Sequence, residues 1–252
     1  MSRSPMRSTP PSVRVLFLSV GTQPTLQLAY DEFLAAIGDR HLVELYRPTE
    51  ALAEQLEAVK VVVDLGGWAT REMIDAGRAA DVELWQVLGY GLDHIDVSYV
   101  LKCSLLLAHT PGECTAVALA EHALFLMLCL EKNLNESRRN LRLGIFYQPF
   151  GGELSGKTLG VIGLGASGRE LARRARAMGM RVIAVDARDI PESDRRDLEI
   201  QFFGGPEDLG RVLEEADYVS IHTPLTSSTR HLIDEDAFSR MKPTAALINV
   251  AR

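Results

Sequence analysis

Short apolar runs of strand length alternate along the chain with longer stretches of helical periodicity. Within the first 110 residues, the runs predict strands at 13–19, 42–45, 59–65, 84–88 and 105–108, with helices at 25–37, 50–58 and 71–78. Strands that alternate with helices of this length indicate a parallel sheet covered on both faces. We therefore expect a doubly wound α/β domain over 13–110, preceded by a Ser-, Pro- and Arg-rich tail over 1–12 that is predicted to be disordered.

The turn sequence Thr110-Pro111-Gly112 interrupts this alternation. A single long helix is predicted from about 115 to 141, followed by an irregular glycine-rich segment over 143–157. Further strands are predicted near 159–163, 181–186, 200–203, 217–221 and 245–249. The chain is therefore expected to form two doubly wound parallel-sheet α/β domains, 13–110 and 111–252, with the long helix crossing between them.

Composition and charge exclude several classes of protein. The 252 residues are 46% hydrophobic and 24% charged, as in an ordinary soluble globular protein, and the net charge of −7 argues against a nucleic-acid-binding surface. The most apolar stretch, 116–130, carries Glu121 and His122, so we expect a buried helix rather than a membrane span. Three cysteines without a C-x-x-C pair argue against a disulfide framework or a metal site and fit a reducing cytoplasm.

The most informative motif is a glycine-rich loop between a predicted strand and a predicted helix. It reads Gly163-Leu164-Gly165-Ala166-Ser167-Gly168. Gly163 allows the tight turn, Gly165 lets a pyrophosphate approach the backbone, and Gly168 lets helix and strand pack closely. The pyrophosphate is expected at the helix N-terminus, where free N–H groups and the helix dipole attract an anion. The motif in this context predicts a dinucleotide-binding unit.

The residue that ends the next predicted strand indicates which dinucleotide binds. A carboxylate at Asp186 can hydrogen-bond the ribose hydroxyls of the adenosine. Arg188 could instead accept a 2′-phosphate, but the neighbouring carboxylate repels one. We therefore expect NAD rather than NADP.

Several ordered motifs together resemble the D-isomer-specific 2-hydroxyacid dehydrogenases, a family that includes phosphoglycerate dehydrogenase and glyoxylate reductase. Besides the glycine loop they are Gly89-Tyr90-Gly91-Leu92-Asp93-His94-Ile95-Asp96, Thr110-Pro111-Gly112, Val117-Ala118-Leu119-Ala120-Glu121-His122, His222-Thr223-Pro224-Leu225-Thr226 and Ile248-Asn249-Val250-Ala251-Arg252. The resemblance implies a flavodoxin-like substrate domain, a Rossmann NAD-binding domain and a homodimer formed with help from the long helix. It also implies NAD-dependent reduction of a small 2-keto acid to a D-2-hydroxy acid, in the cytoplasm and without a nucleic-acid or membrane partner.

The resemblance assigns roles to residues beyond the glycine loop. Cofactor contacts carry over to Ala166, Ser167, Asp186, Thr223, Pro224, Tyr90 and the backbone near Val250. The substrate carboxylate is expected at backbone N–H groups of Leu65, Gly66 and Gly67. Trp68 departs from the small or basic residue that relatives carry there, which leaves the identity of the acid open.

The resemblance places the catalytic arginine at Arg252, where a guanidinium can pair with the substrate carboxylate and polarise the reacting carbonyl. The family's catalytic Glu and His lie downstream of this arginine. The sequence therefore predicts a chain truncated at its C-terminus, with an incomplete Rossmann domain and no turnover by itself. His222 is interpreted as a structural or cofactor-loop residue, and Asp93 and Asp96 as turn and helix-cap residues. The alternative function is a non-catalytic NAD(H) sensor resembling the C-terminal-binding-protein corepressors.

Overall fold

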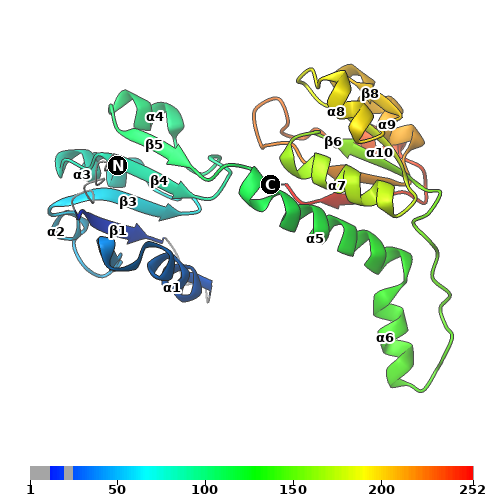
Figure 1. The fold of residues 1–252 in the computed structure, drawn as a ribbon, viewed down its shortest axis with the longest axis horizontal. Helices are drawn as coiled ribbons and strands as arrows, with labels where there is room; N and C mark the ends of the chain where they lie inside the picture. The colour runs from blue at the N-terminus through cyan, green and yellow to red at the C-terminus, as the bar shows by residue number, and fades with distance from the viewer. Residues whose placement is uncertain (1–11, 20–24, 252) are drawn as a thin grey trace, which may run out of the picture. The chain divides into compact units, whose positions relative to one another are not determined.

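The computed structural model describes residues 12–19 and 25–251. Within them the chain forms two compact units that divide between Pro111 and Gly112, here called unit 1 and unit 2. Each unit is built on its own five-stranded parallel sheet, coloured from blue to green in unit 1 and from green to red in unit 2 (Figure 1). The predicted fold class of two doubly wound α/β domains is confirmed. Most of the expected tail, residues 1–11, and the proposed catalytic Arg252 lie outside the described residues.

The sheet of unit 1 has the strand order β2-β1-β3-β4-β5. Its strands are β1 (Arg14–Leu18), β2 (Leu42–Leu45), β3 (Val59–Leu65), β4 (Leu84–Leu88) and β5 (Leu106–His109). Its helices are α1 (Thr25–Ile37), α2 (Leu52–Gln55), α3 (Arg71–Ala79) and α4 (Val97–Lys102), with a 3₁₀ turn at Gly38–Arg40. The sequence pattern predicted all five strands but did not predict α4.

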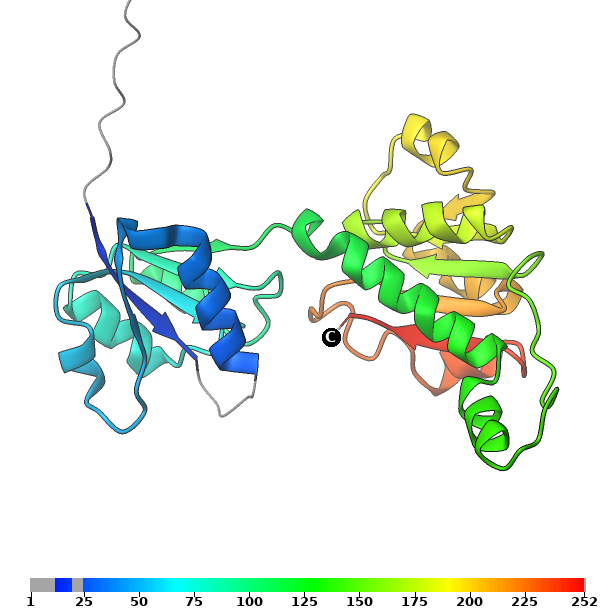
Figure 2. The same cartoon turned by 60° about the horizontal axis from the view of Figure 1, so that its bottom comes forward.

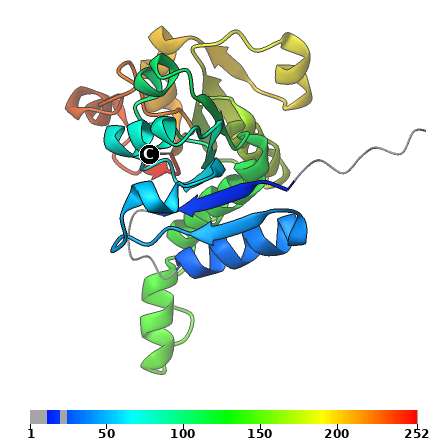
Figure 3. The ribbon, with the colours of Figure 1, turned by 90° about the vertical axis from the view of Figure 1, so that its left-hand side faces the viewer.

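Alternation along β1 distributes apolar side chains to the two faces of this sheet. Val15 and Phe17 pack with residues of α1 on one face, and Figure 3 shows α1 alongside the blue strand β1. Leu16 and Leu18 belong to the larger cluster on the opposite face, which includes Trp85. A strand that is buried on both faces reads as a continuous apolar run, which explains why the sequence predicted these strands well.

The sheet of unit 2 has the strand order β10-β9-β6-β7-β8. Its strands are β6 (Thr158–Ile162), β7 (Arg181–Val185), β8 (Phe202–Gly204), β9 (Tyr218–Ile221) and β10 (Ala246–Asn249). Its helices are α5 (Glu113–Glu131), α6 (Leu134–Arg142), α7 (Ala166–Ala177), α8 (Glu192–Asp197), α9 (Leu209–Glu215) and α10 (Glu235–Arg240), with a 3₁₀ turn at Pro206–Asp208. Helices α5 and α7 cover one face, and α9 and α10 cover the other.

The prediction of one continuous helix over 115–141 is wrong. Helix α5 ends at Glu131, and α6 begins at Leu134 after Asn133, whose φ of 48° is left-handed. Asparagine tolerates this conformation better than most residues, and its side chain donates to the Phe150 carbonyl at 3.3 Å. Figure 2 shows α6 turning away from the line of α5. Tertiary contacts at the break therefore override a helical periodicity that continues through it.

Helix α5 is long and apolar enough to cross a membrane by length and composition alone. Its side chains Ala120, Ala123 and Met127 are buried in the core cluster that includes α7 and the sheet, and Ala116 is buried as well. The expected burial therefore holds for one face of the helix. On the other side, Phe125 is 54% exposed.

Candidate dinucleotide site in unit 2 and ligand loop in unit 1

The glycine loop of unit 2 joins β6 to α7 at the carboxyl edge of the sheet. Gly163 has a φ of +95°, and a Cβ atom there would lie 3.0 Å from the backbone of His222. A Cβ atom at Gly168 would lie 2.1 Å from the carbonyl oxygen of Gly163. Both positions therefore require glycine, for the turn and for close packing of α7 on the strand, as the sequence predicted.

Gly165 faces open space rather than the interior of the protein. A Cβ atom there would meet only the Arg188 Nη2 atom, at 3.3 Å. The loop borders a cavity of about 460 Å³ whose lining includes Gly165, Ala166, Arg169, Arg173 and Arg188. Glu113 and Glu170 also line this space, and the three arginines pair with carboxylates. The first N–H groups of α7 are therefore the feature that suits an anionic pyrophosphate.

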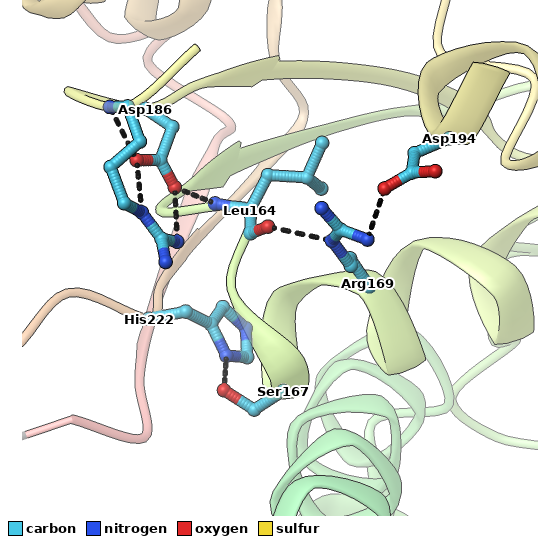
Figure 4. Close-up of polar contacts among 7 residues, drawn as sticks. Leu164, Ser167, Arg169, Asp186, Asp194 and His222 are labelled. Carbon is cyan, nitrogen blue, oxygen red and sulfur yellow. Dashed lines mark hydrogen bonds and ion pairs between the residues drawn. The ribbon is translucent and has the colours of Figure 1, made fainter. Parts of the chain in front are cut away.

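Asp186 follows β7 and reaches back to the loop (Figure 4). Its carboxylate accepts hydrogen bonds from the Leu164 N–H at 2.8 Å and the Arg188 N–H at 2.9 Å. The Arg188 guanidinium binds both carboxylate oxygens, at 3.1 and 3.0 Å. Burial acts to raise the pKa of Asp186, but these donors outweigh it, so its pKa lies below the usual value. Asp186 is therefore ionised near neutral pH. The exposed Arg188 guanidinium pairs with the same carboxylate oxygens that are expected to bind the ribose.

His222 connects the loop to the neighbouring strand β9. Its Nδ1 atom lies 2.9 Å from the Ser167 Oγ atom, as Figure 4 shows, and its Nε2 atom lies 2.9 Å from the Ser220 Oγ atom. Desolvation lowers the pKa of His222 to about 4, so the imidazole is neutral at pH 7. A neutral ring can donate from one nitrogen and accept at the other, which matches two hydroxyl partners.

The remaining predicted cofactor residues of unit 2 lie at the same edge. Thr223 and Pro224 follow β9, and they line a cavity of about 220 Å³ together with Asn249 at the end of β10. Val250 packs against the core cluster of α5 and α7. Strand β9 neighbours β6 at the point where the strand order reverses, which is where ligands bind in open α/β sheets. Tyr90 belongs to unit 1, where its carbonyl lies 3.0 Å from His109 Nδ1.

In unit 1, the loop proposed for the substrate follows β3. Gly66 and Gly67 have left-handed φ values of +90° and +74°. The N–H of Gly66 donates to the Leu88 carbonyl at 3.2 Å. That donor is therefore already paired within unit 1 in this structure.

Asp64 is a buried residue beneath this loop that was not singled out from the sequence. Its carboxylate accepts from the N–H groups of Trp68 at 3.0 Å and Ala69 at 3.1 Å, and from the Trp85 indole at 3.1 Å. Burial raises its pKa above the usual value, although these donors act in the opposite direction. An acidic residue within the apolar run 59–65, two positions before a pair of glycines, was the available signal. Asp96 has the predicted role of helix cap, because it accepts from the Tyr99 N–H at the start of α4.

Comparison with known proteins identifies one family. Residues 124–252 match the family model described as "D-isomer specific 2-hydroxyacid dehydrogenase, NAD binding domain". The chain is 36% identical over 185 residues to a hydroxypyruvate reductase of Thermotoga maritima, and 30% identical over 223 residues to a D-3-phosphoglycerate dehydrogenase of Methanocaldococcus jannaschii. These matches cover 73% and 88% of this chain but only 57% and 41% of the two relatives.

Solved structures agree with the sequence comparison. A D-lactate dehydrogenase from Aquifex aeolicus, complexed with NAD and lactic acid, superposes with a TM-score of 0.76 at 28% identity. It covers 94% of this chain, and this chain covers 69% of it. A glyoxylate reductase from Paecilomyes thermophila superposes with a TM-score of 0.74 at 26% identity, covering 96% of this chain and 74% of that one.

Proposed function

Because the chain belongs to the D-isomer specific 2-hydroxyacid dehydrogenase family and carries its NAD-binding domain, we propose that it acts in the NAD-dependent reduction of a small 2-keto acid to the D-2-hydroxy acid. The observation that carries this proposal is the dinucleotide site of unit 2. A glycine loop with two obligatory glycines, a helix N-terminus and a strand-end carboxylate meet at the switch point of a parallel sheet.

Different residues of unit 2 bind different parts of the cofactor. The cofactor supplies the hydride when it is bound. The N–H groups at Gly165, Ala166 and Ser167 hold the pyrophosphate. The Asp186 carboxylate accepts hydrogen bonds from the ribose hydroxyls after the Arg188 side chain moves away from the carboxylate oxygens. Neutral His222 holds the Ser167 hydroxyl in place without adding a charge beside the pyrophosphate.

Residues of both units are proposed to contact the substrate. The Arg252 guanidinium pairs with the substrate carboxylate and polarises the reacting carbonyl. Leu65, Gly66 and Gly67 are proposed to line the substrate site on the ground of the family resemblance, although in this structure the side chains of Trp68 and Val87 lie against the two glycines. Tyr90, which is 51% exposed, and the backbone near Val250 are each proposed as cofactor contacts on the ground of the family resemblance.

A homodimer is proposed because unit 2 exposes a contiguous stretch of large apolar side chains beyond the core helix. Over 141–150 the side chains of Leu141, Leu143, Phe146, Tyr147 and Phe150 are 62%, 64%, 63%, 88% and 86% exposed. Apolar side chains gathered in one exposed segment indicate an interaction surface. Light scattering at micromolar concentration should report twice the mass of the chain, and a monomer would contradict the proposal. The cytoplasm is the proposed compartment, in keeping with the free thiols of Cys103, Cys114 and Cys129.

The test of the cofactor site is Gly165→Val. The nearest atom to the new side chain belongs to the flexible end of Arg188, so the fold should survive while the branched side chain fills the space of the pyrophosphate. Loss of charge-assisted hydrogen bonds should weaken NADH binding on the order of tenfold to a hundredfold. Ala177→Val, which adds the same side chain at the exposed end of α7, is the matched control. Equal NADH affinity in both variants by fluorescence titration would refute the placement of the cofactor.

A further inference from the structure

A chain of hydrogen bonds through His222 links the interior of the unit 2 sheet to the first turn of α7. Ser220 lies on β9, His222 follows the last residue of that strand, and Ser167 is the second residue of α7. Each ring nitrogen lies 2.9 Å from one serine Oγ atom, and Figure 4 shows the contact with Ser167. Because the ring is neutral, the two hydroxyls and the ring carry one proton each. Two hydrogen bonds use two of these protons, so one is left at an end of the chain.

The Ser220 end offers no acceptor for that proton. Ser220 is fully buried, and it pairs in register with the apolar residues Val161 on β6 and Ile248 on β10. Among the residues that the structure describes, the His222 Nε2 atom is the one hydrogen-bond partner of the Ser220 hydroxyl. Proteins rarely leave a buried donor without an acceptor, whereas an unused lone pair is tolerated more often. The Ser220 proton is therefore directed at Nε2.

This direction fixes the tautomer of the His222 ring. An Nε2 atom that accepts from Ser220 carries no proton, so the single proton of the neutral ring lies on Nδ1. The Nδ1–H group then donates to the Ser167 Oγ atom. As a result, the Ser167 hydroxyl proton points away from the ring and needs an acceptor elsewhere. The opposite tautomer would instead leave the unused proton buried at Ser220.

The Ser167 hydroxyl lies in the turn where the pyrophosphate is proposed to bind. Its own backbone N–H is one of the free N–H groups at the start of α7, and Gly165 directly before the helix leaves open space there. Within the described part of the chain, the hydroxyl has no hydrogen-bond partner besides His222. An anion in this turn would supply the acceptor that the hydroxyl proton lacks. A hydrogen bond to a charged acceptor is roughly twice as strong as one between neutral groups.

We infer that the Ser167 hydroxyl donates a hydrogen bond to the cofactor pyrophosphate, and that His222, with its proton on Nδ1, holds the hydroxyl in that direction. This inference rests on the proposed function and adds a side-chain donor to the backbone N–H groups named there. Ser167 touches the cofactor, whereas His222 is a positioning residue. No proton is transferred, and each hydrogen bond of the chain polarises the next.

The first measurement determines the tautomer in the free protein. Long-range ¹H–¹⁵N NMR spectra of the histidine-labelled full chain distinguish a protonated ring nitrogen from an unprotonated one, and the His222→Asn spectrum identifies the resonances of His222. At pH 7.5 the proton is expected on Nδ1. A ring with its proton on Nε2, or with both nitrogens protonated, would overturn the inference.

The second measurement compares a ligand that has a pyrophosphate with one that has none. NADH affinity is measured by fluorescence titration, and adenosine affinity by competition with NADH. Ser167→Ala should weaken NADH about tenfold through loss of a charge-assisted hydrogen bond, while adenosine changes less than about twofold. Ser167→Thr, which keeps the hydroxyl, should restore most of the affinity. The matched control is Ser193→Ala, at the second residue of α8. Unchanged NADH affinity in Ser167→Ala, or an equal loss for both ligands, would refute the inference.

A double-mutant cycle separates positioning by His222 from a structural role. His222→Leu should weaken NADH about fivefold when Ser167 is present and less than about twofold in the Ser167→Ala background. An equal loss in both backgrounds would show that His222 only supports the fold. If the unmodified chain binds no NADH, the proposed function itself fails, whereas the results above refute this inference alone while NADH still binds.

Discussion

Protonation of His222 should make unit 2 unstable in mild acid. The ring is held neutral between two serine hydroxyls, and desolvation lowers its pKa from 6.5 to about 4. In the unfolded chain the same imidazole binds a proton below about pH 6.5. Between these two pKa values the unfolded state therefore binds more protons than the folded state, so stability falls as the pH falls. Above about pH 7.5 the imidazole is almost entirely neutral in both states, and His222 adds no pH dependence.

The magnitude follows from the difference between the two pKa values. It corresponds to at most about 3 kcal/mol at pH 4, of which about 2 kcal/mol is already present at pH 5. His222→Asn keeps one donor and one acceptor but cannot bind the proton. The variant should therefore lose about 2 kcal/mol less stability than the unmodified protein between pH 7.5 and pH 5.

Urea unfolding at the two pH values measures this difference. Both tryptophans, Trp68 and Trp85, belong to unit 1, so tryptophan fluorescence follows unit 1 and serves as an internal control. Far-UV circular dichroism adds the transition of unit 2. Histidine-ring NMR gives a direct check, because the resonance absent from His222→Asn should remain that of a neutral ring down to about pH 5. Titration of that resonance between pH 6 and 7, or identical pH dependence in both proteins, would refute the reasoning.

Three further variants test the other contacts. Gly168→Ala places a Cβ atom 2.1 Å from the Gly163 carbonyl, so unit 2 should lose about 2–4 kcal/mol and bind NADH poorly; a thermal midpoint within 1 °C of the original would contradict this. Arg188→Ala frees the Asp186 carboxylate and removes a cation, so the ratio of NADH to NADPH affinity should rise several-fold in fluorescence titrations, and an unchanged ratio would count against a role in cofactor choice. Asp64→Asn leaves at least one loop N–H without an acceptor and should cost unit 1 about 1–3 kcal/mol in urea unfolding followed by tryptophan fluorescence; an unchanged midpoint would show that the loop does not depend on the carboxylate.

The features that were predicted from the sequence are those that depend on residues close together in the chain. Strands such as 59–65 and 181–185 have buried residues on both faces and are mostly apolar, so they can be recognised without the fold. The turn at Gly163 and the packing at Gly168 are requirements of one loop, and a short motif records them. The family match of residues 124–252 confirms the recognition that these motifs suggested.

Contacts between residues far apart in the chain were not predictable in this way. The break at Asn133 is stabilised by Phe150, and the Asp64 carboxylate is shared with Trp85 on another strand. The hydrogen bonds of His222 were not predicted, because its two partners, Ser167 and Ser220, come from different elements. Short helices such as α4 and α10 bury few residues and leave little periodicity to detect.

The break at Asn133 has a consequence for how the family can diversify. The segment from α6 to Phe150 is closed at its base by the Asn133 side chain and by Lys132, which donates to the Gly152 carbonyl at 2.6 Å. The core clusters of unit 2 do not draw on α6 among the described residues. Mutations or changes in length within this segment can therefore accumulate without disturbing the glycine loop. Changes in this segment would alter the surface proposed for the dimer and leave the dinucleotide site intact.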